Sequence, residues 1–134
     1  MELALLSDSQ LRDRLRRREG GERRLVAELL RHLALADERH AERGWGFPSL
    51  FYYCTQELRY SEAAAYKRIQ AARLCASFPK LLDMLERGET NLSAALLLRP
   101  HLTGENEANI LGRVSQKTQR QVEAVVAELA PRPD

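Results

Sequence analysis

The sequence predicts an all-α fold, a compact domain built from several helices. Seven glycines and five prolines in 134 residues leave little material for hairpins. Valine and isoleucine are scattered, whereas leucine, alanine, arginine and glutamate recur at helical spacing. With 44% hydrophobic residues, the chain is long enough to build one core.

Residues 1–44 are expected to form a long N-terminal amphipathic helical segment. Ser7 and Gln10 have the spacing of a capping box, so the helix should begin at about Ser9. Gly20 and Gly21 predict a break or a bend, because each glycine inside a helix costs about 1 kcal/mol relative to alanine. The apolar pattern then resumes and continues until Gly44. Its members are Leu25, Val26, Leu29, Leu30, Leu33 and Ala36.

Residues 45–134 are expected to form a helical domain that contains a helix-turn-helix-like unit at about 49–76. Ser49 and Ser61 are suited to cap helices over about 50–58 and 62–76, and three residues connect these helices. Arg59 occupies the turn position where such units usually carry a glycine with positive φ. We therefore expect either strain or a different turn at this residue.

Each of the remaining helices carries its own start signal, and two of them carry a stop signal. The starts are Pro79, Asn91 or Ser93, Thr103, and the capping-box pair Thr118 and Gln121. The stops are Gly88, which favours a left-handed residue, and Pro100, which cannot continue a helix.

The helix predicted over 62–76 is the candidate recognition helix for double-stranded DNA. Its alanines allow close packing on one side, while its polar side chains point outward. Lys67, Gln70 and Arg73 are the main candidates for phosphate or base contacts. The full set of candidate DNA-binding residues is Ser61, Glu62, Tyr66, Lys67, Arg68, Gln70 and Arg73. The alternative is an ordinary helical hairpin with a solvated basic face.

A second basic feature lies in the N-terminal segment, where seven arginines outnumber three acidic residues. The arginines are Arg12, Arg14, Arg16, Arg17, Arg18, Arg23 and Arg24. They can clamp a DNA backbone without reading its sequence, or they can form a solvated face paired with neighbouring carboxylates.

The chain is expected to be noncatalytic and to hold no metal or cofactor. His32, His40 and His101 are too far apart in the sequence to make a convincing metal site, and no phosphate-binding loop or nucleophile elbow is present. Cys54 and Cys75 lie in apolar helical contexts and are expected to be buried reduced thiols. The sequence has no recognisable signal peptide and no apolar run long enough to span a membrane. Together with the reduced thiols, this leads us to expect a cytoplasmic location.

Several phrases in order resemble the helical region that precedes the nuclease domain in bacterial HNH endonuclease-like proteins. They are SLFYYCTQEL, SEAAAYKRIQAARL, FPKLLDMLERGE, the PHLT turn and the QRQVE helix. The resemblance covers about residues 25–134, and PRPD (131–134) resembles the start of a linker toward the nuclease module. The metal-binding histidines and asparagine of that module are absent from this sequence, so the resemblance implies no nuclease chemistry for any residue here.

The order of helices is also similar to the central DNA-binding region of the ParB partition proteins. A serine-capped helix is followed by LLDMLERGE and then by NLSAALLL. This similarity implies DNA binding by the helix-turn-helix-like unit.

Two functions from different classes follow from these observations. One is a noncatalytic DNA-binding module, the recognition or accessory part of an HNH endonuclease-like protein. The other is a protein interaction or homodimerisation module without nucleic-acid contact, with Leu25, Leu29 and Leu33 as the candidate partner face.

Overall fold

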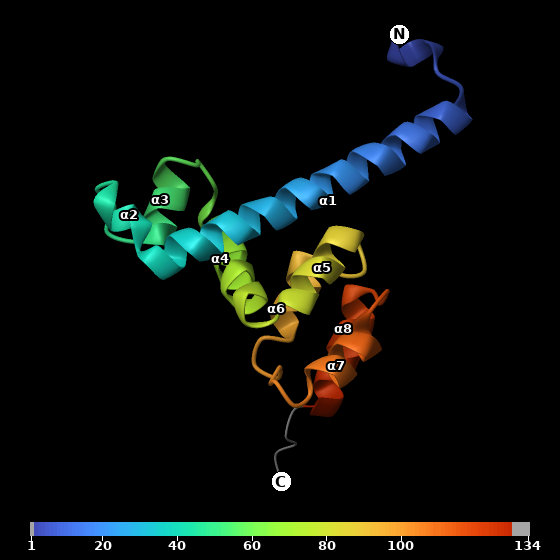
Figure 1. Cartoon of the computed structure of the whole chain (residues 1–134). Helices are drawn as coiled ribbons and strands as arrows, with labels where there is room; N and C mark the ends of the chain where they lie inside the picture. The colour runs from blue at the N-terminus through green and yellow to red at the C-terminus, as the bar shows by residue number, and fades with distance from the viewer. Residues whose placement is uncertain (1, 130–134) are drawn as a thin grey trace.

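The computed structural model describes residues 2–129 and confirms the all-α fold class (Figure 1). Over these residues the chain forms one short 3-10 helix and eight α-helices, with no strand. They are η1 (Leu3–Leu5), α1 (Asp8–Arg39), α2 (Ala41–Gly44), α3 (Leu50–Gln56), α4 (Glu62–Ser77), α5 (Pro79–Arg87), α6 (Leu92–Leu97), α7 (Glu107–Val114) and α8 (Gln119–Leu129).

Helix α1 is continuous over 32 residues, so the break predicted at Gly20 and Gly21 is wrong. The capping box at its start is confirmed, because the Ser7 hydroxyl accepts from the Gln10 amide and the Gln10 side chain accepts from the Ser7 amide. An ion pair of 3.0 Å between Arg23 and Glu19 spans the glycine pair. The helical residues on both sides of the pair offset the free-energy cost of placing two glycines in a helix, because helix formation is cooperative.

The C-terminal end of α1 comes earlier than the sequence pattern predicts. His40 adopts a left-handed conformation with φ 52, which ends the helix at Arg39. A single turn, α2, then carries the chain to Gly44. The positive φ changes the chain direction here, which places α2 and α3 together beside the end of α1 (Figure 1).

Helix α4 lies at the centre of the fold and contacts α1, α3, α5 and α6. Its buried residues include Ala65, Ile69 and Ala72, and α1 contributes Ala27 and Leu30 to the same core. Helices α5 to α8 lie on the side of α1 where α4 packs, whereas the N-terminal end of α1 projects away from the other helices (Figure 1). We call residues 8–19 of α1 the arm.

Most of the predicted helix boundaries are confirmed by side-chain caps. The Ser49, Ser61 and Asn91 side chains each accept from a backbone amide three residues later. Pro79 opens α5, Gly88 ends it with φ 79, and Thr118 and Gln121 exchange the bonds of a capping box before α8. Thr103 pairs with Asn106 instead, so that it caps a turn, and α7 begins only at Glu107.

Two predictions concern the ends of the chain and its relation to membranes. The PRPD ending, residues 131–134, lies outside the described residues. Among the described helices, none combines the length and the apolar character that a membrane span requires.

Both cysteines are buried and unpaired, as the sequence predicts. Burial raises the pKa of the Cys75 thiol to about 12, and burial also raises the pKa of the Cys54 thiol. A thiolate is the reactive form of cysteine, so both thiols are held in the unreactive form at neutral pH.

We expect neither thiol to react with a disulfide reagent such as DTNB while the protein is folded at pH near 8. In denaturant both Cys54 and Cys75 should react with the reagent. Absorbance of the released thiolate follows the reaction directly, and rapid labelling of the folded chain would contradict the burial of these side chains.

Candidate nucleic-acid interface

Helices α3 and α4 occupy the residues predicted to form a helix-turn-helix-like unit, and the turn between them depends on Arg59. Arg59 has φ 63, the left-handed conformation that such turns usually assign to glycine. The Tyr60 amide donates to the Cys54 carbonyl at 3.1 Å, which holds the end of α3 against the turn. Ser61 then caps α4. The expected strain at Arg59 is therefore present, and the chain makes the turn despite it.

An aromatic cluster supports this unit from outside. The rings of Trp45 and Phe47 lie 4.9 Å and 5.2 Å from the ring of Tyr53, in tilted and edge-to-face arrangements. Such pairs contribute about 0.5–1.5 kcal/mol beyond area burial. These contacts fasten the segment that precedes α3 to the Tyr53 ring on α3.

Helix α4 has one buried side and one open side. Ala65, Ile69 and Ala72 are buried, and they seat α4 on its neighbours. Ser61, Glu62 and Lys67 are exposed, and Tyr66 keeps 51% of its surface. The open side therefore carries the candidates Glu62, Tyr66 and Lys67, with Ser61 at the start of the helix.

Two candidate residues on this side are tied to the region of α6. The Lys67 ammonium donates to the Ser93 hydroxyl at 3.1 Å, and the Arg99 guanidinium donates to the Gln70 side-chain carbonyl. Arg99 thereby adds a cation next to Gln70, one helical turn along α4 from Lys67. No signal in the sequence places Ser93 and Arg99 at this surface, because only the packing of α6 against α4 brings them there.

Arg73 is held by α1 rather than left free. Its Nε and Nη2 atoms donate to the two carboxylate oxygens of Asp37, each at 2.9 Å. The hydrogen bond from Arg73 holds the pKa of Asp37 below its ordinary value, and the same bond raises the pKa of Arg73. A bidentate pair of this kind fixes the orientation of the guanidinium. Contact between Arg73 and DNA, as predicted from the sequence, would require the guanidinium to leave this pair.

Arg68 is also engaged within the chain. Its guanidinium carbon lies 4.7 Å from the centre of the Tyr60 ring, and its Nη1 donates to the Ala64 carbonyl. The side chain is half-buried. Arg68 therefore fastens the turn to the first part of α4 by a cation–π contact.

The three leucines of the candidate partner face are in three different environments. Leu25 is 67% exposed, Leu29 is half-buried against the core, and Leu33 is 4% exposed. Leu33 belongs to the chain's own core and is not accessible to a partner, so its assignment to that face is wrong. The rotation of the helix between Leu25 and Leu33 carries Leu33 into the core, and the spacing of leucines in the sequence does not distinguish the core side from the exposed side.

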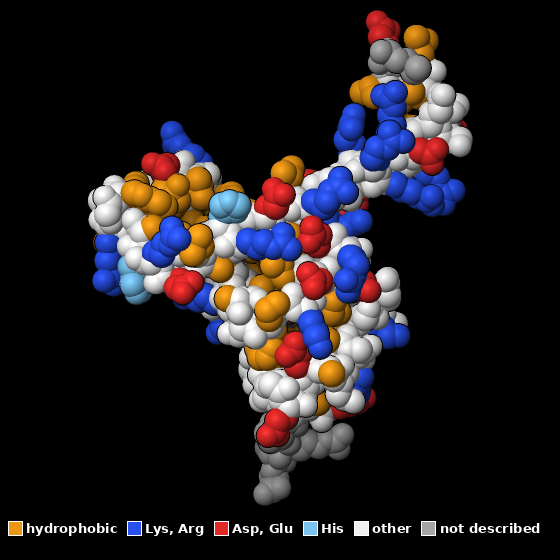
Figure 2. Space-filling model, in the orientation of Figure 1, with side chains coloured by type: hydrophobic (Ala, Val, Ile, Leu, Met, Phe, Trp, Pro, Cys, Tyr) orange, Lys and Arg blue, Asp and Glu red, His pale blue; other side chains and the backbone are white. Residues whose placement is uncertain are grey.

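Cationic side chains gather along the arm on the face that Figure 2 shows. Arg23 pairs with Glu19, whereas Arg12, Arg16, Arg17 and Arg18 are exposed on the helix surface. The arm is thus a projecting rod with cationic side chains on several sides. This exposure is compatible with both interpretations of the arginines, as side chains that bind the phosphates of DNA and as a solvated helix face.

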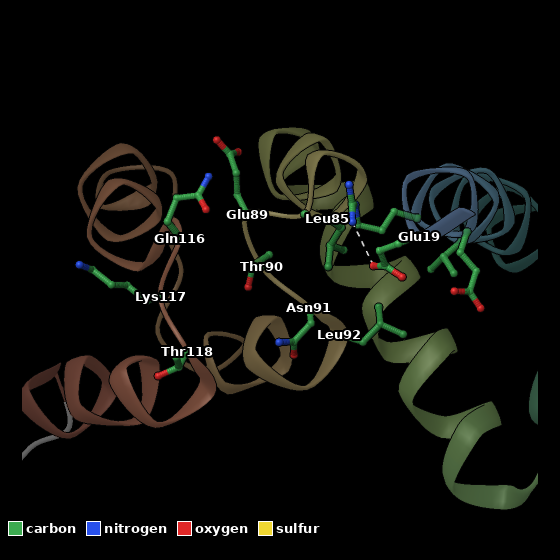
Figure 3. Close-up of a pocket in the computed structure, with 13 residues that line it drawn as sticks. Glu19, Leu85, Glu89, Thr90, Asn91, Leu92, Gln116, Lys117 and Thr118 are labelled. Carbon is green, nitrogen blue, oxygen red and sulfur yellow. Dashed lines mark hydrogen bonds and ion pairs between the residues drawn. The ribbon is translucent and has the colours of Figure 1, made fainter. Parts of the chain in front are cut away.

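A separate cavity of about 440 Å³ lies between α1, the α5–α6 connection and the α7–α8 connection (Figure 3). Thr90, Asn91 and Gln116 contribute polar side chains to its wall. The Thr90 hydroxyl is buried without a hydrogen-bond partner. The cavity therefore offers hydrogen bonds to a small polar molecule or to water, and its wall contains neither cysteine nor histidine.

Metal ligands do not cluster in the part of the chain that the structure describes. No group of three histidine, cysteine, aspartate or glutamate side chains is placed to hold an ion there. His40 caps α1, and His32 contacts the Glu28 carbonyl through Nδ1 at 2.6 Å.

Comparisons of this chain with family models, with curated proteins and with solved structures find no match.

The ion pair between Arg73 and Asp37 predicts a pH-dependent contribution to stability. The pKa of Asp37 is lowered on folding from its ordinary value of 3.8, so the contribution is present above that value and is lost as the pH falls below it. We expect Arg73→Gln to lower the free energy of unfolding by about 1 kcal/mol or less near neutral pH, because the pair is partly exposed. Urea unfolding near pH 7 and near pH 3 measures this, and the difference between variant and wild type should shrink in acid. A difference that grows in acid would contradict the pairing.

The conformation of Arg59 predicts which substitutions the turn accepts. Arg59→Gly should leave stability unchanged or raise it by up to about 1 kcal/mol, since glycine adopts positive φ without strain. Arg59→Val should destabilise by about 1–2 kcal/mol, because a β-branched residue is disfavoured at positive φ. Thermal unfolding followed by circular dichroism ranks the variants. Equal stability of the glycine and valine variants would contradict a left-handed residue here.

Proposed function

We propose that the chain is a noncatalytic module that binds double-stranded DNA through the open side of α4. The observation that carries the proposal is the α3–turn–α4 unit, with Arg59 in the left-handed conformation and α4 capped by Ser61. In DNA-binding proteins of this architecture, the second helix enters the major groove and the first helix supports it.

The side chains on the open side of α4 are suited to a polyanion. Lys67 on α4 and Arg99 in the turn after α6 supply two cations, and Gln70 on α4, which accepts from Arg99, can read a base edge. Ser61 is at the helix start, where free backbone amides favour a phosphate. Tyr66 offers an exposed ring and hydroxyl beside them.

A side chain on this surface must give up its hydrogen bond within the chain before it can bind DNA, and the strength of that bond sets the cost. Lys67 is bonded to a neutral hydroxyl and Gln70 to a flexible arginine, so both exchange partners at low cost. Arg73 would have to leave a bidentate carboxylate pair. We therefore assign Lys67, Gln70 and Arg99 to DNA contact, and Arg68 and Arg73 to holding α4 in position.

The resemblance to the region preceding the nuclease domain of HNH endonuclease-like proteins gives this module a context. A helical unit that holds the duplex would present DNA to a catalytic domain. The exposed arginines of the arm would add phosphate contacts that carry no sequence information.

The proposal predicts a specific loss of binding for the double variant Lys67→Gln with Arg99→Gln. Titration of the purified chain against a labelled random duplex at two salt concentrations should show binding that weakens as salt rises. The double variant should bind about tenfold more weakly or worse, with the salt slope reduced by about two contacts. A matched control, Lys117→Gln with Arg120→Gln, removes the same charge from the α7–α8 side and should change binding much less.

Circular dichroism should show unchanged unfolding of both double variants, because all four side chains are exposed. Wild-type chain that binds no duplex at low salt would overturn the proposal. So would binding that is lost in Arg16→Gln with Arg17→Gln but kept in the Lys67 and Arg99 variant, since this result would place the contact on the arm alone.

A further inference from the structure

The arm and the turns of α1 that follow it expose a stripe of leucines that the core of the chain does not use. Leu11, Leu15 and Leu25 are 43%, 62% and 67% exposed, respectively. At about 3.6 residues per turn, these three residues lie on one side of α1, about a quarter of a turn away from the side that faces the core. Figure 2 shows apolar side chains along the projecting helix among its charged ones.

The stripe continues through two charged residues at its centre. Counting by alternating steps of three and four residues gives the stripe residues Leu11, Leu15, Arg18, Glu22, Leu25 and Leu29. These six lie within about 80° of arc, the arrangement of a coiled-coil seam. The seam is thus apolar at both ends, with one arginine and one glutamate between the leucines.

We infer that this seam binds the same seam of a second copy of the chain, in antiparallel orientation about a two-fold axis near Gly20 and Gly21. In that register Leu11 of one copy faces Leu29 of the other, and Leu15 faces Leu25. Arg18 then faces Glu22, and the symmetry repeats each contact. The seam is therefore complementary to itself in both apolarity and charge.

Charge selects the antiparallel orientation. A parallel pair would place Arg18 against Arg18 and Glu22 against Glu22 in adjacent layers, and like charges in contact disfavour that pairing. In the antiparallel register the flanking residues Arg14 and Glu28 of the two copies are also neighbours of opposite charge. Over residues 2–129 neither Arg18 nor Glu22 has an ion pair within its own chain.

The middle of the seam is suited to close contact between two helices. Gly21 lies at the edge of the seam near the proposed axis, and a hollow there is bounded by Arg18, Glu22 and Leu25. The absence of a Cβ lets a second backbone approach. Glu19, which would meet its own copy across the axis, is already paired with Arg23. The glycine pair, a weakness for an isolated helix, thus fits the crossing point of two helices.

This dimer does not use the side chains of the α4 surface that are assigned to DNA contact. The seam lies on α1, whereas the DNA contacts proposed above lie on α4 and near α6. The exposed Arg16 and Arg17 are on the outer side of the arm, where they stay accessible after dimerisation.

A charge exchange between Arg18 and Glu22 tests the register. Sedimentation equilibrium over a series of concentrations should show a dimer for wild type. Each single reversal, Arg18→Glu or Glu22→Arg, should raise the dissociation constant at least about tenfold, because like charges then meet twice. The double variant Arg18→Glu with Glu22→Arg should restore wild-type affinity.

Mixing the two single variants gives a second, independent readout. A copy carrying Arg18→Glu and a copy carrying Glu22→Arg place opposite charges at both central contacts, so they should form a mixed dimer in preference to either homodimer. Leu15→Glu should give a monomer with unchanged thermal unfolding, since Leu15 lies outside the core. The matched control Arg17→Glu should leave the dimer intact.

A wild-type chain that stays monomeric at every concentration would overturn the inference. A dimer that tolerates Leu15→Glu, or a double charge exchange that fails to restore association, would also overturn it, since either result places the contact elsewhere.

Discussion

The packing of α1 on α4 is the contact on which the rest of the structure depends. Both helices carry fully buried alanines at the core, Ala27 on α1 and Ala65 and Ala72 on α4, and small side chains let helix backbones approach closely. At the edge of the same interface, Arg73 and Asp37 form the bidentate pair that joins the two helices. Because α4 also contacts α3, α5 and α6, its position relative to α1 determines where every later helix can lie.

This central position of α4 limits what the helix can offer to a partner. Its buried residues leave one open side, and the polar groups there already bond to Ser93, Arg99 and Asp37. Neutral or flexible partners allow Lys67 and Gln70 to exchange for DNA, whereas the carboxylate of Asp37 keeps Arg73 in the fold. An arginine on a predicted recognition helix is therefore not a DNA contact by position alone.

The long α1 separates two parts of the molecule that differ in their surroundings. Its second half contributes Ala27 and Leu30 to the core, whereas the arm is exposed to solvent on most sides. A helix of 32 residues spans about 48 Å, more than the helices packed against it require. An exposed apolar stripe on such a projection is characteristic of an interaction surface, and the capping box at Ser7 stabilises the helical form of the arm before any partner binds.

The sequence by itself determined the local features of this protein: the helical class, the caps at Ser49, Ser61 and Asn91, and the stop at Gly88. Each of these features depends on side chains and backbone groups within four positions of one another, so a short stretch of sequence is enough to predict it. Only the tertiary structure decided that α1 runs through its glycine pair, that Leu33 points into the core, and that Arg73 meets Asp37. The last contact joins residues 36 positions apart, and such a pairing depends on how helices pack, which no local pattern specifies.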